Sequence, residues 1–156
     1  MSVIATSPVG ATAWVYISNA DSQDISVFQL DRAGGALKPV GVVPVGGMAM
    51  PMVVSRDKKF LYVALRSQPF RVVTFAIDGV TGGLKKLGEA ALADSMANID
   101  LDASGKWLFA ASYGGHKITV NSVGPDGLVG AVQQLIPTSP NAHAIHMDPT
   151  GNYVFA

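Results

Sequence analysis

The stretch Phe60-Leu61-Tyr62-Val63 is the clearest structural signal in this chain, because it occurs four times with conservative changes. The other copies are Trp14-Val15-Tyr16-Ile17, Trp107-Leu108-Phe109-Ala110 and Tyr153-Val154-Phe155-Ala156. Each copy has an aromatic residue in third place, and these aromatics are separated by 46, 47 and 46 residues. A fixed period of roughly 40–50 residues built from short strands is typical of β-propeller blades. The sequence therefore predicts an all-β chain, a β-propeller of four-stranded antiparallel blades.

The second repeat shows how the strands of one blade are expected to follow one another. Its four predicted strands cover residues 52–54, 60–65, 72–77 and 84–91. β-Branched and aromatic residues favour strands, and glycines such as Gly82 and Gly83 supply the positive φ of tight turns. No segment keeps a helical periodicity, so almost no helix is expected. A β-sandwich with accidental repeats is the alternative, but three concordant steps and matching turns argue against it.

The repeat spacing divides the chain into blades at residues 1–48, 49–95 and 96–141, followed by a shorter repeat at 142–156. The fourth copy stops in mid-strand at Ala156, so we expect part of a ring and not a whole one. An incomplete ring leaves unpaired sheet faces and an open edge strand, which favour association. Self-association, or pairing with a companion fragment that completes the ring, is therefore expected.

The composition narrows the classes of function. Eleven basic and eleven acidic residues give no net charge, so nucleic acid is not an expected partner. Without cysteine there is no disulfide framework, thiolate nucleophile or cysteine zinc site, and neither a cofactor nor a metal is expected. No apolar run approaches the roughly 18 residues that span a bilayer, so no membrane partner is expected. The first ten residues lack the pattern of a secretory signal, which favours the cytoplasm.

Several longer motifs resemble one known family. The run from Pro51 to Val63 begins Pro-Met-Val-Val-Ser-Arg-Asp-Lys, and the run from Ala142 to Gly151 places a histidine before Asp-Pro-Thr-Gly. Two shorter matches are Phe70-Arg71-Val72 and Ser112-Tyr113-Gly114-Gly115. Nearly the whole chain is similar to the lactonase family of seven-bladed β-propellers, which includes propeller-type 6-phosphogluconolactonases and carboxymuconate-lactonizing enzymes. Since family members are about twice as long, the resemblance implies about three and a half blades of a seven-bladed ring.

Strand direction sorts the expected loops onto two rims of the propeller. The first strand of each blade lines the central channel, so the loop before it and the loop between the second and third strands share one rim. That rim collects the polar residues Arg66, Gln68, Arg71, Asn98, Tyr113, His116, Lys117, Asn141 and His143. The other rim collects only generic turns, such as residues 56–59 and 104–106. A concave mouth with convergent polar groups is the usual place for a site.

His143 is the predicted catalytic residue, because it comes just before an inner strand and histidine suits a general base near neutral pH. In the family's lactonizing enzymes the corresponding histidine is a proposed active-site residue. Arg66 and Arg71 are candidate clamps for an anionic substrate, since a guanidinium group binds phosphate or carboxylate at two points. The other candidate substrate-binding residues are Asn98, Tyr113 and His116.

Two positions on the inner strands carry weaker expectations. Asn98 stands where some relatives have a histidine, which argues against an acid–base role at that position. His146 occupies the repeat position held by Asp100 in the previous blade, and it is expected to be a satisfied histidine between blades. The spacing of His143 and His146 does not match a zinc pair, because strand residues three apart point to opposite faces.

These residues favour an enzyme, a lactonase that hydrolyses a sugar-acid lactone such as 6-phosphogluconolactone, with a small anionic lactone as its partner. Hydrolysis needs a water activated by a base, a donor for the developing oxyanion and cations for the substrate. A carboxymuconate cyclase needs the same groups, so the sequence does not separate the two reactions. The alternative from another class is a non-catalytic propeller that binds a ligand or serves as a scaffold, because a fold does not fix chemistry.

Overall fold

The computed structural model of this chain describes residues 2–5 and 12–156, where strands are the regular elements. Residue 1 and residues 6–11 lie outside the described residues, and they belong to the first predicted blade and to the segment expected to lack a secretory signal. The described part contains no helix, and hence none of the length and apolar character needed to cross a membrane. The expectation of an almost helix-free chain is confirmed for these residues.

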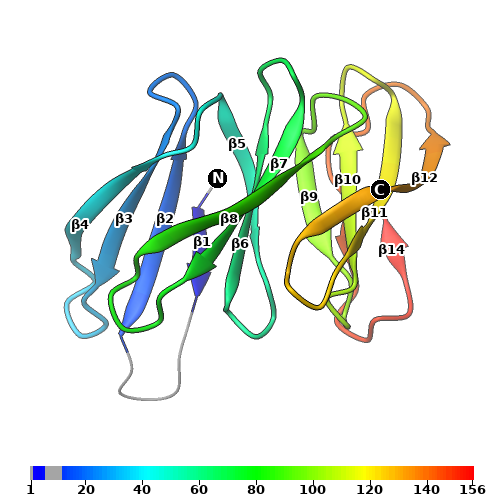
Figure 1. Cartoon of the computed structure of the whole chain (residues 1–156). Helices are drawn as coiled ribbons and strands as arrows, with labels where there is room; N and C mark the ends of the chain where they lie inside the picture. The colour runs from blue at the N-terminus through cyan, green and yellow to red at the C-terminus, as the bar shows by residue number, and fades with distance from the viewer. Residues whose placement is uncertain (1, 6–11) are drawn as a thin grey trace.

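Three four-stranded sheets and one hairpin follow each other along the chain (Figure 1). The first sheet contains β1 (Ser2–Ala5), β2 (Ala13–Asn19), β3 (Asp24–Leu30) and β4 (Leu37–Pro44). The second contains β5 (Ala49–Val54), β6 (Phe60–Leu65), β7 (Arg71–Ile77) and β8 (Leu84–Ala91). The third contains β9 (Asn98–Leu101), β10 (Trp107–Ser112), β11 (Lys117–Val123) and β12 (Val129–Pro137). The hairpin pairs β13 (His146–Met147) with β14 (Val154–Phe155).

Each sheet has the topology of a propeller blade. Neighbouring strands pair in chain order and run antiparallel. The first strands of successive sheets lie next to one another, since β5 contacts both β1 and β9, and β9 contacts β13. This arrangement places β1, β5, β9 and β13 on the inner side of the array and β4, β8 and β12 on the outer side. The predicted blade architecture of antiparallel four-stranded sheets is confirmed.

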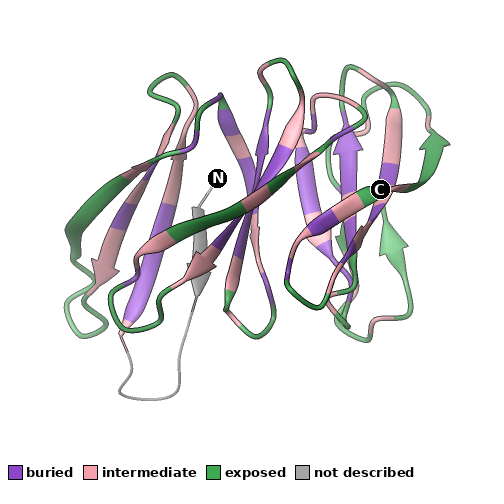
Figure 2. Cartoon of the chain, viewed as in Figure 1, coloured by how far each residue is buried: buried purple, intermediate pink, exposed green. Residues whose placement is uncertain are grey.

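The second sheet is buried on both faces, as Figure 2 shows for β6. Alternate residues of a strand point to opposite faces, and β6 divides its side chains accordingly. Leu61, Val63 and Leu65 pack into a core shared with the first sheet, while Tyr62 and Ala64 pack into a core shared with the third. The outer strands, in contrast, are exposed, and most residues of β4 are in contact with solvent. Burial of both blade faces explains the apolar composition of the chain.

A recurring turn closes the first hairpin of the second and third sheets and of the last repeat. Ser55, Asp102 and Asp148 occupy the same place, and each side chain accepts a hydrogen bond from the backbone N–H five residues later. Burial opposes ionisation of Asp102, but hydrogen bonds from Ser104 and Trp107 outweigh it and hold the pKa of its carboxyl below the ordinary value. Side-chain acceptors of this kind replace the backbone partners that a tight turn leaves unsatisfied.

The turn at Asp148 makes a pH-dependent contribution to the last hairpin. The Thr150 hydroxyl and the backbone N–H groups of Tyr153, Thr150 and Asn152 donate to this carboxylate and lower its pKa to about 2. Because the folded pKa is depressed, the stabilising effect is present above the ordinary aspartate pKa and is lost as the pH falls through about 2. We expect a carboxyl ¹³C NMR titration to give a pKa of about 2. Thr150→Val should raise it toward the ordinary value, and an unchanged titration in that variant would contradict the assignment.

Candidate functional site

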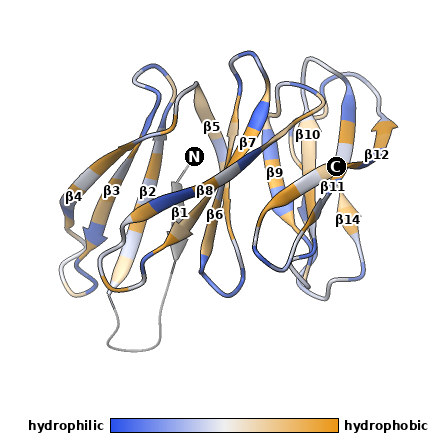
Figure 3. Cartoon of the chain, in the orientation of Figure 1, coloured by the Kyte–Doolittle hydropathy of each residue, from blue (hydrophilic) through white to orange (hydrophobic). Residues whose placement is uncertain are grey.

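The loops of the array fall on two opposite rims, as strand direction predicts. In Figure 1 the upper rim carries the β6–β7 loop (residues 66–70), the β10–β11 loop (113–116) and the β12–β13 loop (138–145). The lower rim carries the β5–β6 turn (55–59) and the β9–β10 turn (102–106). Figure 3 shows hydrophilic connections at both ends of the apolar second sheet. All five predicted substrate-binding residues and His143 lie in or next to upper-rim loops.

His143 and Tyr113 meet on the upper rim. Their ring centroids are 5.7 Å apart and the ring planes are perpendicular, so the two rings make an edge-to-face contact. Both residues are exposed, and the Tyr113 side chain is 46% accessible. One comes from the loop after β10 and the other from the loop before β13. The structure thus brings two predicted residues together and leaves the imidazole open to solvent and to a substrate.

His116 holds the loop that carries His143. Its Nδ1 accepts a hydrogen bond of 3.0 Å from the backbone N–H of Asn141, and its carbonyl accepts one of 2.9 Å from Thr138. His116 and Asn141 both have positive φ, at 52° and 72°. The neutral imidazole therefore carries its proton on Nε2. A role of His116 in substrate binding stays a prediction, but the contacts give it a positioning role next to the site.

Asn98 anchors the strand that follows His143. This residue is 4% exposed, and its Oδ1 accepts a hydrogen bond of 2.9 Å from the buried backbone N–H of Ile145. The bond joins the start of β9 to the start of β13 across the gap between two repeats. Asn98 therefore fixes the chain two residues beyond His143. Direct contact of Asn98 with a substrate stays a prediction.

The two predicted arginine clamps have different surroundings. Arg71 donates from its two terminal nitrogens to the carbonyls of Pro69 and Gly46, at 2.9 and 2.6 Å, and its Nε lies 3.4 Å from a Glu89 carboxylate oxygen. Hydrogen bonding from Lys86 and the charges of Lys86 and Arg71 hold the pKa of that carboxyl below its ordinary value. Arg71 therefore ties the β6–β7 loop to the connection between β4 and β5.

Arg66 is the more available cation. Its Nε donates to the Ser95 hydroxyl at 3.0 Å, which connects the second sheet to the loop before β9. Among the described residues, none engages its two terminal nitrogens. An exposed guanidinium group that is oriented through Nε keeps both terminal nitrogens free for an anion. Of the two arginines, Arg66 thus has the geometry that a substrate clamp requires.

An ion pair shapes the glycine-rich loop beneath Tyr113. Lys117 Nζ lies 2.7 Å from an Asp94 carboxylate oxygen, and both side chains are about one quarter exposed. A Cβ on Gly115 would come within 2.1 Å of the same oxygen, so only glycine lets the Asp94 carboxylate approach. The Ser112 hydroxyl accepts a hydrogen bond from the Gly115 N–H. These contacts fix the loop that presents Tyr113 to His143.

Sequence reasoning missed the contact between Asp100 and His146. The His146 Nδ1 lies 3.4 Å from an Asp100 carboxylate oxygen, which also accepts a hydrogen bond of 3.0 Å from the Met147 N–H. The His146 side chain is 58% exposed, and its contact with Asp100 of the neighbouring repeat agrees with the expected histidine satisfied between blades. The shared repeat position of these two residues was the available signal, because inner strands of adjacent blades lie side by side. A carboxylate at Nδ1 orients an imidazole as a base at Nε2.

The described residues contain no cluster of three or more histidine, cysteine, aspartate or glutamate side chains that could hold a metal ion. The upper rim carries side chains that are suited to acid–base chemistry. It combines exposed imidazoles, a free guanidinium group and backbone groups at the channel mouth.

Comparison with known proteins shows which family this chain matches in sequence and which fold it matches in structure. The family described as "Lactonase, 7-bladed beta-propeller" matches residues 12–156. A protein of Pectobacterium carotovorum named 6-phosphogluconolactonase is 38% identical over 142 residues, which cover 91% of this chain and 42% of that protein. A protein of the same name from Erwinia tasmaniensis is 38% identical over 141 residues, which cover 90% of this chain and 42% of that protein. This chain spans about two fifths of the length of these curated relatives.

A solved structure of the periplasmic gluconolactonase of Pseudomonas aeruginosa has a similar fold. It superimposes with a TM-score of 0.76 at 20% identity, and the match covers 90% of this chain and 40% of that one. At this level of identity the likeness concerns the fold alone. The coverage agrees with the strand count, because three four-stranded sheets and a hairpin amount to about half of a seven-bladed ring.

Proposed function

Because this chain belongs to the lactonase family of seven-bladed β-propellers, we propose that it provides part of the active site of a lactone hydrolase acting on a sugar-acid lactone such as 6-phosphogluconolactone. The observation that carries the proposal is the 38% identity, over 91% of this chain, to a protein named 6-phosphogluconolactonase. The family expected from the motifs is thus confirmed. The upper rim supports the proposal by bringing His143 and the terminal nitrogens of Arg66, which have no partner among the described residues, to the same side of the array.

In the proposed reaction His143 accepts a proton from water as the water attacks the lactone carbonyl. The carbonyl carbon becomes tetrahedral and its oxygen takes the negative charge. When the carbonyl re-forms, the ring C–O bond breaks and the leaving oxygen takes the proton from His143, which gives the acid and a hydroxyl group and restores the neutral imidazole. Tyr113 keeps the imidazole of His143 at the rim through the edge-to-face contact. Asn98 and His116 hold the chain on either side of His143.

Arg66 is the proposed contact for the anionic end of the substrate. A phosphate group accepts two parallel hydrogen bonds from a guanidinium fork, and the terminal nitrogens of Arg66 have no partner among the described residues. Arg71 contributes by holding the β6–β7 loop, whose first residue is Arg66. The donor groups of Arg71 itself face Gly46, Pro69 and Glu89.

The two arginines should respond differently to substitution in the whole protein. We expect Arg66→Ala to raise KM for 6-phosphogluconolactone about tenfold with a small change in kcat, since it removes a contact made in both ground and transition states. The KM for glucono-δ-lactone, which lacks the phosphate, should change little. Steady-state rates above spontaneous hydrolysis measure both effects. Equal effects on the two lactones would refute the phosphate contact.

Arg71→Ala is the matched comparison, and we expect it to act on stability. It removes hydrogen bonds to two carbonyls and leaves Glu89 without one of its cations. Thermal unfolding of Arg71→Ala should have a lower midpoint than that of Arg66→Ala. Any change in KM caused by Arg71→Ala should be the same for the lactones with and without the phosphate. A phosphate-specific rise in KM for Arg71→Ala alone would assign the clamp to Arg71 instead.

The cytoplasm is the proposed compartment, since a phosphorylated lactone is a multiply charged solute that a bilayer retains where it is made. Measuring the activity in fractionated cells tests this. Association with a second copy or with a companion fragment stays a prediction, and sedimentation of the purified chain across a range of concentrations tests it. A monomer at all micromolar concentrations would contradict it.

A further inference from the structure

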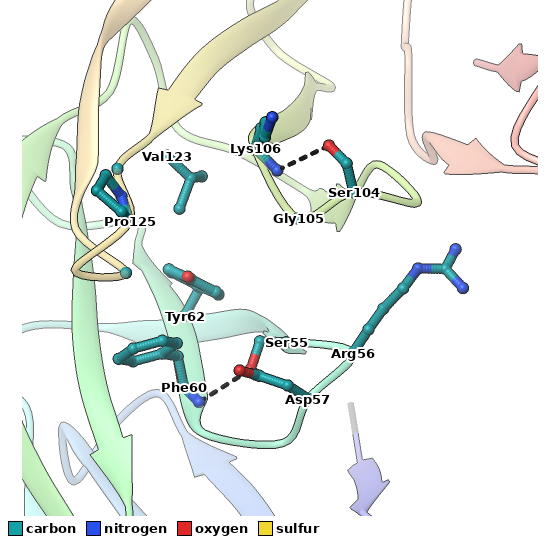
Figure 4. Close-up of a pocket in the computed structure, with 12 residues that line it drawn as sticks. Ser55, Arg56, Asp57, Phe60, Tyr62, Ser104, Gly105, Lys106, Val123 and Pro125 are labelled. Atoms are coloured by element: carbon teal, nitrogen blue, oxygen red, sulfur yellow. Dashed lines mark hydrogen bonds between the residues drawn. The ribbon is translucent and has the colours of Figure 1, made fainter.

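A pocket lies on the lower rim, between the second and third sheets, where the sequence predicted only generic turns. Its volume is about 440 Å³, and it is bounded by the β5–β6, β9–β10 and β11–β12 turns. Figure 4 shows Tyr62 between Phe60 and Val123, with Arg56 and Lys106 on the turns that flank the opening. The residues proposed for the lactonase reaction all belong to the opposite rim.

The repeat explains why this space is open. In the first sheet the residues at the corresponding positions are Trp14 and Tyr16, whose polar atoms donate hydrogen bonds to the carbonyls of Gly79 and Gly82 in the next sheet. The second sheet has Phe60 and Tyr62 instead. Phenylalanine has no N–H to donate, so the first of these bonds has no counterpart between the second and third sheets.

The second bond is missing because the receiving turn is shorter. Six residues, 78–83, connect β7 to β8, whereas five residues, 124–128, connect β11 to β12. The Phe60 ring still packs on Gly127 as Trp14 packs on Gly82, since a Cβ on either glycine would come within 2.6 Å of the ring. The Tyr62 hydroxyl, however, has no hydrogen-bond partner among the described residues. The lower-rim end of the interface between the two sheets is therefore left open.

The pocket combines a phenol donor with cations at its mouth. Tyr62 is 1% exposed, and burial, reinforced by the nearby charges of Asp57 and Asp126, raises its pKa to about 12, so the hydroxyl keeps its proton. The Tyr62 hydroxyl is not fully enclosed, so a ligand acceptor or a water in the pocket can reach it. The side chains of Arg56 and Lys106 are exposed and have no ionic partner among the described residues.

The one carboxylate in the lining is already engaged. Asp57 accepts a hydrogen bond of 2.7 Å from the Ser55 hydroxyl and lies 3.4 Å from Lys59 Nζ. The lining therefore has an excess of positive charge. Phe60, Val123 and Pro125 add apolar surface on the side of Tyr62. A ligand that fits needs a planar apolar body, an acceptor for the phenol and a negative charge for the two cations.

We propose that this pocket is a second binding site, which takes a small aromatic or similarly planar organic anion, with its ring against Phe60 and its acidic group between the Tyr62 hydroxyl and the cations Arg56 and Lys106. Figure 4 draws both cations extended away from Tyr62, so binding includes a rotamer change of these two exposed side chains. The site does not depend on the lactonase proposal, because it shares no residue with it.

The test is a titration of the ¹⁵N-labelled full chain with benzoate, followed by NMR. We expect saturable shifts confined to the β5–β6, β9–β10 and β11–β12 turns, and weaker binding as salt is raised, because exposed charges are screened. Benzamide has the same shape without the charge and should bind about tenfold more weakly. Acetate, which lacks the ring, should cause no saturable shift there. Equal binding of benzoate and benzamide, or shifts spread over the surface, would overturn the proposal.

Two variants test the geometry of the pocket. Tyr62→Phe keeps the ring and removes the donor, and it should weaken benzoate binding about tenfold. Phe60→Trp should abolish binding, because Trp14 shows that an indole fits the equivalent position against a glycine of the next sheet. The spectrum of each variant away from the pocket reports whether it is folded. Wild-type affinity in a folded Phe60→Trp variant would exclude the site, as would wild-type affinity in Tyr62→Phe.

Discussion

Replacing His143 with alanine is expected to lower kcat/KM for 6-phosphogluconolactone by about 100-fold or more, because general acid–base catalysis typically contributes that much to a rate. The loss should fall on kcat and not on KM, since proton transfer from water matters only in the transition state. His143 is exposed on the rim and makes an edge-to-face contact with Tyr113, so its removal should not disturb a core. Rates above the spontaneous hydrolysis, measured in the whole protein, give the comparison.

The neighbouring histidines provide matched controls. His146→Ala, three residues away and next to Asp100, should change kcat less than about fivefold if His143 is the base. His116→Ala removes the acceptor for the Asn141 N–H and should loosen the loop. We expect this variant to have a lower unfolding temperature and a much smaller loss in kcat than His143→Ala. A loss of less than about threefold in His143→Ala would remove His143 from the base role. A large loss in both His146→Ala and Asp100→Asn would assign the base to that pair.

The strands were predictable because their side chains repeat and alternate. The predicted strands at residues 60–65 and 84–91 match β6 and β8 at both ends. β6 could be recognised from a buried apolar run between two polar turns, and its copies at 46 to 47 residues confirmed the pattern. The inner strand of the second sheet starts at Ala49, three residues earlier than predicted, and its pairing with β6 is irregular between Ala49 and Met52. A local irregularity of this kind leaves no mark in the periodicity.

The site was less predictable because side-chain partners come from distant parts of the chain. Strand direction is a consequence of the repeat, so the rim of each loop followed from the sequence. The difference between Arg66 and Arg71 did not, since it rests on a carbonyl at Gly46 and a carboxylate at Glu89. In the same way the Asn98 contact reaches 47 residues along the chain to Ile145. Repeat spacing could have revealed that contact, because residues one repeat apart lie on adjacent inner strands.

The lower-rim pocket was missed for a different reason. The second, third and last repeats share one turn pattern there, and sequence reasoning treated them as equivalent. The pocket depends on two small departures from the repeat, the exchange of Trp14 for Phe60 and the loss of one residue from a turn. In a repeat protein, departures of this kind change packing at one interface and leave the others intact.

Phe75→Ala is expected to cost about 3–5 kcal/mol in the free energy of unfolding, the usual range for removing a buried phenylalanine. Phe75 is 1% exposed and belongs to the core between the first and second sheets, together with Tyr16, Leu61 and Val73. β7 is paired on both sides, with β6 and β8, so its backbone has little freedom to collapse into the cavity. Urea unfolding followed by tryptophan fluorescence measures the change, since Trp14 lies in the same core.

Leu135→Ala is the control for Phe75→Ala, because Leu135 is 48% exposed on the outer strand β12 and should cost less than about 1 kcal/mol. If blades are stabilised mainly by packing against their neighbours, the two variants must differ by several-fold. A similar small loss for both would mean that the face between the first two sheets contributes little, and strand pairing within each sheet would then be the main source of stability. A large loss for Phe75→Ala alone would show that the inter-blade cores are the main source of stability. The same cores support the strands from which the rim loops and His143 extend.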